Sequence, residues 1–202
     1  MAISNYAELK AAVADFLNRD DLTSVIPNFI ALAEADIARK VRHWRQHKRV
    51  STDVDQRYEH LPTDFLEVIR IQLDDYSQLR PISSDEMAQM RSKYNNTAGT
   101  PKFYYLTANQ LEFYPSPDQT YSISMLYSAR VPNLSDTDDT NWLLTQNPDI
   151  LLYGSLVQSA PYLQNDERVA VWGSMYTNGI ESLNRDSMRS SASGGALVMR
   201  PR

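Results

Sequence analysis

The sequence contains no cysteine, which excludes a disulfide framework, a thiolate metal site and a cysteine nucleophile. It has six glycines among 202 residues, and they form no phosphate loop, dinucleotide fingerprint or Gly-x-Ser-x-Gly elbow. No apolar run approaches the length of a membrane span, and the N-terminus lacks the basic-then-apolar pattern of a signal peptide. These absences predict a protein without membrane segments, compatible with assembly in a reducing cytoplasm.

An excess of positive charge is also missing. The chain has 25 acidic residues against 20 lysines and arginines, with a formal net charge of −5. This balance disfavours a general nucleic-acid-binding protein, although it leaves room for a local basic patch. At 202 residues the chain can bury a core large enough to need no covalent staples, in one domain or in a domain with an insert.

Two helical patterns occupy the N-terminal 49 residues. Asn5 and Glu8 have the spacing of a capping box at the start of the first. Thr23 is placed to cap the second, whose apolar stripe runs from Ile26 to Trp44 over about five turns. A short connection between two opposed stripes predicts an α-helical hairpin.

The C-terminal part contains a second helical pattern. Asn147 is a candidate N-cap, and Pro148 suits the first helical position, where no backbone donor is needed. Residues 165–167 open a further helix. Small residues interrupt the large apolar ones and predict close helix approach: Gly154, Ser155, Ser159 and Ala160.

Between the helical regions, the hydrophobic period changes from 3.6 to 2 after Val50. The alternation slips at Ile69, which predicts a β-bulge or bend in the first strand. We expect strands at residues 66–73, 102–106, 110–114 and 121–129, and a short helix at residues 83–94.

These segments predict an α+β fold in three parts. An α-helical bundle is built from the N- and C-terminal helical hairpins, residues 1–49 and 132–189. A small antiparallel β-domain, residues 50–131, is inserted between them. An extended C-terminal tail, residues 190–202, follows. The tail cannot bury enough apolar surface alone to offset its ordering entropy, so we expect a neighbouring subunit or partner to hold it.

Two patterns resemble metal sites. His43 and His47 have the i, i+4 spacing of two ligands on one helix face, but no glutamate completes a zinc-protease motif and cations surround the pair. The acidic run 136–139 lacks the glycine and the final glutamate of a calcium loop. A solvated basic helix end and a solvated acidic turn explain both patterns, and we predict no metal and no cofactor.

Catalytic carboxylate pairs are equally weak. Asp64 with Glu67, or Glu112 with Asp118, could serve glycoside cleavage, but nothing in the sequence marks either pair as desolvated. Many of the twelve tyrosines fall in or beside predicted strands, where aromatic residues serve packing first. We therefore predict no catalytic residue and no enzymatic activity.

One cluster exceeds what local structure requires. Six cations crowd eleven positions at the predicted end of the second helix and its exit: Arg39, Lys40, Arg42, Arg45, Lys48 and Arg49. Cations near a helix C-terminus compensate the helix dipole, but this purpose needs fewer of them. A contact with an acidic partner, with another subunit or with a phosphate backbone remains open beside a solvated charged face.

Several segments carry a resemblance to a known family. They include Ile-Pro-Asn-Phe-Ile-Ala-Leu-Ala-Glu-Ala at 26–35, Leu-Pro-Thr-Asp-Phe-Leu-Glu at 61–67, Leu-Glu-Phe-Tyr-Pro at 111–115 and Asn-Trp-Leu-Leu-Thr-Gln-Asn-Pro-Asp-Ile-Leu-Leu-Tyr-Gly at 141–154. In pattern and order, the chain resembles the head-to-tail adaptor proteins of short-tailed bacteriophages, also called gatekeeper or tail tubular proteins.

The resemblance implies a structural virion protein at the head–tail junction, assembled in the host cytoplasm. Such adaptors form a ring, usually of twelve copies, that joins the portal to the tail nozzle or fibres. The ring encloses the channel through which the genome leaves, without sequence-specific DNA binding. By this resemblance the helical part and the tail dock the portal, and the β-domain faces the tail. The portal-docking residues are then Leu197, Val198, Met199, Arg200 and Arg202.

Two alternatives remain. The first is a nucleic-acid-binding protein that uses the basic helix end at residues 39–49, and it predicts salt-dependent binding by the isolated protein. The second is a tail-associated glycan hydrolase, which predicts loss of activity when one carboxylate is changed.

Overall fold

The structure is a computed structural model that describes residues 3–95, 97–163 and 166–192. The chain divides into two compact units. A helical unit contains the residues up to Trp44 and those from Val131 onward, and a β-unit contains residues Arg45–Arg130. The mixed α+β class predicted from the sequence is confirmed. The chain enters the β-unit five residues before Val50, where the sequence pattern changes period.

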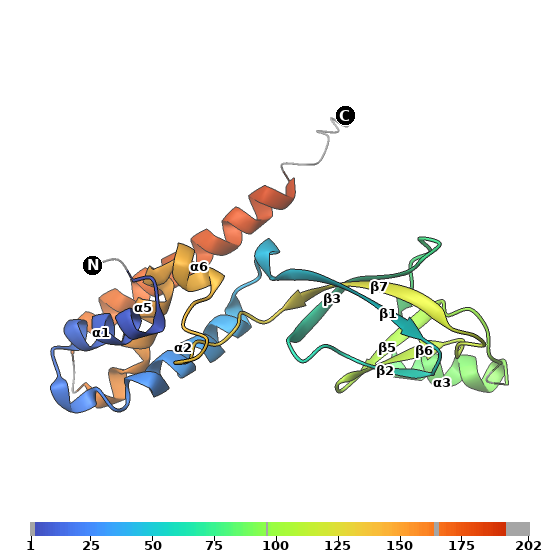
Figure 1. Cartoon of the computed structure of the whole chain (residues 1–202), viewed down its shortest axis with the longest axis horizontal. Helices are drawn as coiled ribbons and strands as arrows, with labels where there is room; N and C mark the ends of the chain where they lie inside the picture. Colours follow the sequence, from blue (N-terminus) through green and yellow to red (C-terminus); the bar gives the residue numbers. More distant parts are fainter. Residues whose placement is uncertain (1–2, 96, 164–165, 193–202) are drawn as a thin grey trace. The chain divides into compact units, whose positions relative to one another are not determined.

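The helical unit is built around one short apolar helix, α5. Its elements are α1 (Tyr6–Leu17), η1 (Asp20–Leu22), α2 (Ile26–Lys40), α4 (Trp142–Gln146), α5 (Pro148–Gln158), η3 (Ala160–Tyr162) and α6 (Arg168–Ala192). α5 packs against α1, α2 and α6 (Figure 1). α1 and α2 contact α5 more than each other, so α5 is the element that the other helices of this unit share.

The small residues of α5 allow this close packing, as the sequence predicted. A Cβ atom added to Gly154 would lie 3.0 Å from Cε2 of Tyr176 and 3.3 Å from Cβ of Ala33. Those two residues belong to α6 and α2, so Gly154 is the point where three helices meet. On α6, a Cβ atom at Gly179 would lie 3.0 Å from Cγ1 of Ile150.

The predicted helix starts are partly correct. Asn5 caps α1 by accepting a hydrogen bond from the Glu8 N–H at 2.8 Å, but the Glu8 carboxylate accepts from the Ser4 N–H at 2.7 Å instead of completing the box. The predicted cap at Thr23 is wrong, because α2 begins at Ile26 with Val25 in the N-cap position.

The start of the C-terminal helices also differs from the prediction. Asn147 makes no side-chain capping bond, although Pro148 does occupy the first turn of α5. Asn141 caps a separate short helix, α4, by accepting from the Leu144 N–H at 2.8 Å. The sequence analysis placed the helix start at Asn147 and did not predict α4, which only Asn147 separates from α5.

The end of α2 corrects another prediction. The apolar stripe continues to Trp44 in the sequence, but α2 ends at Lys40 and Val41 is extended. Asn184 of α6 takes over the end of the helix: its side chain accepts from the Arg42 N–H at 2.9 Å and donates to the Lys40 carbonyl at 3.0 Å. A tertiary contact therefore ends this helix, and the local sequence does not encode it.

The β-unit contains two small sheets and one helix. Its elements are β1 (His47–Val54), β2 (Tyr58–His60), β3 (Phe65–Leu73), β4 (Arg80–Pro81), α3 (Ser84–Lys93), β5 (Phe103–Thr107), β6 (Gln110–Tyr114) and β7 (Tyr121–Ala129); the 3-10 turn η2 (Trp44–Gln46) precedes β1. The sheets have the strand orders β1-β7-β3 and β2-β6-β5-β4 (Figure 1). All strand pairs are antiparallel except β4 with β5, which corrects the prediction of a purely antiparallel sheet.

The predicted bulge at Ile69 and the predicted short helix at residues 83–94 are both present in this unit. The register of β3 on β7 shifts between Val68 and Arg70, which makes Ile69 the extra residue of a bulge. The turn between β5 and β6 is tight and places Ala108 in the left-handed region at φ 47°. The capping box of Ser83 and Glu86 starts α3. An apolar core lies inside the unit and includes Ile71, Phe113, Ile123 and Met125.

The tail begins later than the sequence suggested. α6 extends to Ala192, so residues 190–192 are helical rather than extended. The predicted docking residues Leu197, Val198, Met199, Arg200 and Arg202 lie outside the residues that the structure describes.

Candidate functional site

The six cations of the basic segment, residues 39–49, do not form one helix end. Arg39 and Lys40 are in the last turn of α2, and Arg42 follows the helix. Arg45 is in the turn η2, and the remaining two, Lys48 and Arg49, are on β1. The first three belong to the helical unit and the last three to the β-unit.

In the helical unit, Asp36 neutralises two of these cations. Its carboxylate lies 3.1 Å from Nη2 of Arg39 and 2.6 Å from Nζ of Lys40, and it also accepts from the Tyr176 hydroxyl at 2.8 Å. Burial raises the pKa of Asp36, but the hydrogen bonds from Lys40, Tyr176 and Arg39 outweigh it and leave the pKa below its ordinary value. Burial, together with Asp36, raises the pKa of Tyr176. This cluster fastens α2 to α6.

Two more cations have structural partners in the chain. Nη1 of Arg42 donates to the carbonyls of Ala38 at 3.1 Å and Val41 at 2.8 Å, where it caps the end of α2. In the β-unit, Nζ of Lys48 lies 2.6 Å from Oδ2 of Asp64. A cation that serves as a helix cap or an ion-pair partner is less available to a phosphate.

Asp64 is also tied to the centre of its sheet. The Tyr127 hydroxyl of β7 donates to Oδ1 of Asp64 at 2.9 Å. Burial raises the pKa of Asp64, but the hydrogen bonds from Lys48 and Tyr127 outweigh it and lower the pKa below its ordinary value. Burial and the bond to Asp64 raise the pKa of Tyr127 to about 12. Among the described residues, Arg49 is the cation of the segment whose side chain has no hydrogen bond or ion pair.

His43 lies in an aromatic stack and not on a solvated helix end. His43 is only 6% exposed, so the prediction that it lies on a solvated helix end is wrong. The ring is stacked on Trp142 at a centroid distance of 5.2 Å and lies 5.4 Å from the ring of Trp44. The Trp44 N–H donates to Oγ of Ser187 on α6 at 3.0 Å. His47 begins β1, so the two histidines do not share the helix face that a metal site would need.

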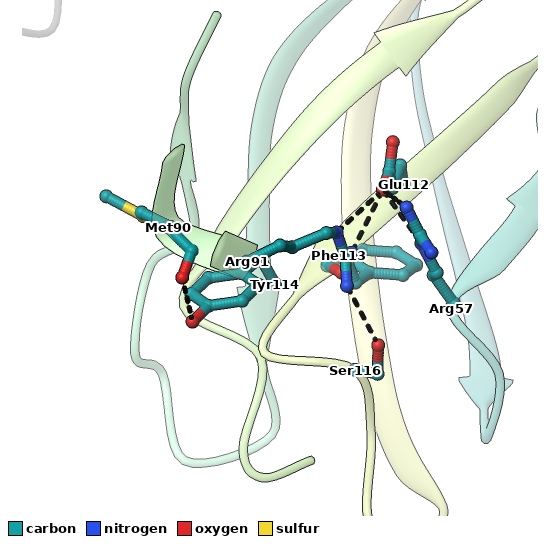
Figure 2. A network of polar contacts seen from close by, with 7 residues as sticks. All are labelled: Arg57, Met90, Arg91, Glu112, Phe113, Tyr114 and Ser116. Carbon is teal, nitrogen blue, oxygen red and sulfur yellow. Dashed lines mark hydrogen bonds and ion pairs between the residues drawn. The ribbon is translucent and has the colours of Figure 1, made fainter. Parts of the chain in front are cut away.

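Two arginines hold the candidate carboxylate Glu112 (Figure 2), and a tyrosine hydroxyl holds Asp118. Glu112 is buried, and its Oε1 lies 2.6 Å from Nη2 of Arg57 and 2.9 Å from Nη2 of Arg91. Arg91 comes from α3 and also donates to the Phe113 carbonyl at 2.9 Å, so it fastens α3 to β6. Asp118 accepts from the Tyr121 hydroxyl at 2.7 Å. This arrangement supports packing and offers no free acid–base pair.

The acidic run before α4 also has a structural explanation. Lys10 of α1 pairs with Asp136 at 2.7 Å, and the Tyr6 N–H donates to the Asp139 carbonyl at 2.7 Å. Glu34 of α2 accepts from the Leu134 N–H at 2.7 Å. These bonds hold the returning chain against α1 and α2.

No group of three or more histidine, aspartate or glutamate residues in the described part of the chain could hold a metal ion. None of the described helices is long and apolar enough to cross a membrane.

The sequence was compared with models of known protein families. The model of the SU10 adaptor protein family matches residues 4–200, which is nearly the whole chain. The chain therefore belongs to this family of phage head-to-tail adaptors. A comparison with curated proteins gives no match. The family has a structural role in the virion and assembles with other virion proteins, as the sequence resemblance implied.

Proposed function

We propose that copies of this protein form a ring, with twelve-fold symmetry, that joins the phage portal to the tail nozzle or fibres. The ring encloses the channel through which the genome leaves. The observation that carries the proposal is the family match over residues 4–200, which spans both units of the fold. The packed roles of the candidate catalytic and metal-binding residues support a structural function.

In this proposal the helical unit and the tail dock the portal, and the β-unit faces the tail. Support comes from α6, which leads from the packed core of the helical unit toward the C-terminus (Figure 1). Near its end Met188 is 74% exposed, an apolar side chain available to a partner. The segment Leu197, Val198 and Met199 then enters a groove on the portal, and Arg200 and Arg202 meet acidic residues there. Binding offsets the cost of ordering the segment.

The basic segment fits a passive role beside DNA. Arg39, Lys40 and Lys48 are neutralised by carboxylates of the same chain, and Arg42 caps a helix. A channel lined with free cations would hold phosphates and slow the passage of the genome. Internal pairing leaves the segment able to position α2, α6 and β1 without strong DNA attraction.

Electron microscopy of the purified protein, alone and mixed with a candidate portal complex, tests the proposal. The expected result is a closed ring on the portal. A variant that ends at residue 192 keeps α6 and lacks only the segment beyond it, and we expect it to lose portal docking while its circular dichroism spectrum stays unchanged. Full-length monomers that ignore the portal would refute the ring, whereas normal docking by the shortened variant would refute only the role of the tail.

A further inference from the structure

One long strand of the β-unit has an unpaired edge. β1 has eight residues and is the first strand of the sheet β1-β7-β3, so only β7 lies beside it (Figure 1). Within the described part of the chain, the backbone groups of residues 47–54 make no hydrogen bond other than those to β7. Alternate N–H and C=O groups of an edge strand point away from its neighbour, where they can pair with another strand.

An apolar groove lies under the same edge. Its volume is about 310 Å³, and Val50 and Thr52 of β1 form one wall. The remaining lining residues are Glu59, His60, Leu61, Pro62, Leu111, Ile123 and Met125. A strand added to β1 would place alternate side chains over this groove, as happens when a peptide extends a sheet.

The other side of β1 is charged in a self-complementary pattern. Val50 and Thr52 face the groove, so Arg49, Ser51 and Asp53 project from the opposite side of the strand, where all three are exposed. Ser51 lies midway between the two charges. In an antiparallel pair with a two-fold axis, opposite residues project from the same side of the sheet. If Ser51 lies opposite Ser51 of a second copy, Arg49 of each copy lies opposite Asp53 of the other.

We propose that two copies of the free protein pair through β1 in this antiparallel register, centred on Ser51. The two three-stranded sheets then form one continuous sheet of both copies, with two Arg49–Asp53 cross-strand pairs. Val50 of each copy lies opposite Thr52 of the other on the groove side, and their methyl groups cover the apolar lining.

The local contacts of β1 agree with this register. Arg49 has no partner in the described part of its own chain. Asp53 accepts from the Ser122 hydroxyl with Oδ1, which orients the carboxylate and leaves Oδ2 for Arg49 of the second copy. A lysine on an edge strand often prevents such pairing, but Nζ of Lys48 is held 2.6 Å from Asp64 of its own chain. The ammonium group of Lys48 is therefore held by its own chain and does not block a second strand at the edge of β1.

Exchange of the two charges tests the proposal on the full-length protein. Analytical ultracentrifugation at protein concentrations from about 1 μM to about 1 mM should show a reversible monomer–dimer equilibrium. Arg49→Asp places Asp opposite Asp, and Asp53→Arg places Arg opposite Arg. Each single variant should raise the dimer dissociation constant by about tenfold or more, because two attractive pairs become repulsive. The double variant restores opposite charges and should restore dimerisation.

Arg70→Asp is the matched control. Leu126 of β7 is the strand partner of both arginines: Arg49 lies opposite it on β1, and Arg70 lies opposite it on β3. The control changes the charge equally on the same sheet, but on the opposite edge strand β3 and away from β1, and it should dimerise normally. Circular dichroism spectra establish that all variants are folded. A wild type that stays monomeric, or that forms only larger assemblies, overturns the proposal, and so does a double variant as monomeric as the single ones. Portal docking is read separately by microscopy, so either idea can fail alone.

Discussion

Gly154 offers the sharpest test of the helical packing. Gly154→Ala adds one methyl group at the contact of α5 with α2 and α6. The new Cβ would lie 3.0 Å from Cε2 of Tyr176 and 3.3 Å from Cβ of Ala33. Neither neighbour can move easily: the Tyr176 hydroxyl is bonded to Asp36, and the Ala33 Cβ is fixed to the backbone of α2.

Two opposing terms set the magnitude. Alanine in place of glycine within a helix stabilises by about 1 kcal/mol. Overpacking of a filled core costs about 1–3 kcal/mol. Gly173→Ala on α6 isolates the first term, because a Cβ atom there meets nothing within 4 Å. We expect Gly173→Ala to gain up to about 1 kcal/mol and Gly154→Ala to be less stable than this control by about 1–3 kcal/mol.

Urea unfolding followed by tryptophan fluorescence measures this difference in free energy of unfolding. All three tryptophans of the chain, Trp44, Trp142 and Trp172, belong to the helical unit, so the signal reports that unit and not the β-unit. The slopes of the two transitions should agree, which makes the midpoints comparable. If Gly154→Ala stabilises as much as Gly173→Ala, the close approach at α5 is not a constraint and the reasoning is refuted.

Three further changes probe the buried polar groups. Glu112→Gln leaves Arg91 without its charged partner and should destabilise the β-unit by about 3 kcal/mol, measured by the far-ultraviolet circular dichroism of urea unfolding. Tyr176→Phe removes the bond to Asp36 and should cost the helical unit about 1 kcal/mol by tryptophan fluorescence. Because the pKa of Asp36 is lowered in the folded protein, the stability it contributes is present above its unfolded pKa and is lost as the pH falls through its folded pKa. Tyr176→Phe should therefore weaken the loss of stability below about pH 4. Glu34→Gln should raise the unfolding midpoint modestly at pH 7, since burial raises the pKa of Glu34 and a neutral amide can accept from Leu134 without burying charge; no rise, or a fall, would contradict this account.

Local periodicity predicted the elements whose burial alternates clearly. The strand at residues 121–129 lies at the centre of its sheet, so alternate side chains are buried and the pattern is strong. The bulge at Ile69 was predicted because an extra residue shifts the phase of the alternation. A short helix was predicted at residues 83–94, and α3 is present there; the capping box of Ser83 and Glu86 that starts it uses bonds that are local in the sequence.

Elements that depend on distant partners were missed. β1 is mostly exposed, and its first three residues, His47 to Arg49, are polar or charged. Its alternation of apolar and polar residues is therefore weak. β4 has only two residues and exists through its pairing with β5. The end of α2 depends on Asn184, which is far away in the sequence and is positioned by α6. Neither hydrophobic period nor capping rules report such contacts.

The basic segment shows why charge density alone is a poor guide to a binding site. Six cations in eleven positions suggested an acidic partner or a phosphate backbone, but their carboxylate partners Asp36 and Asp64 are outside the segment. Asp36 precedes Arg39 and Lys40 by three and four residues on α2, so helix spacing alone brings them together. Asp64 lies just before β3, and the fold brings it to Lys48. In the described part of the chain, the side chain of Arg49 has no ion pair, and it stands beside the edge of β1, two positions from Ser51 and on the same side of the strand as Asp53. The charge that the fold leaves unused is therefore better matched to a second copy of this strand than to DNA.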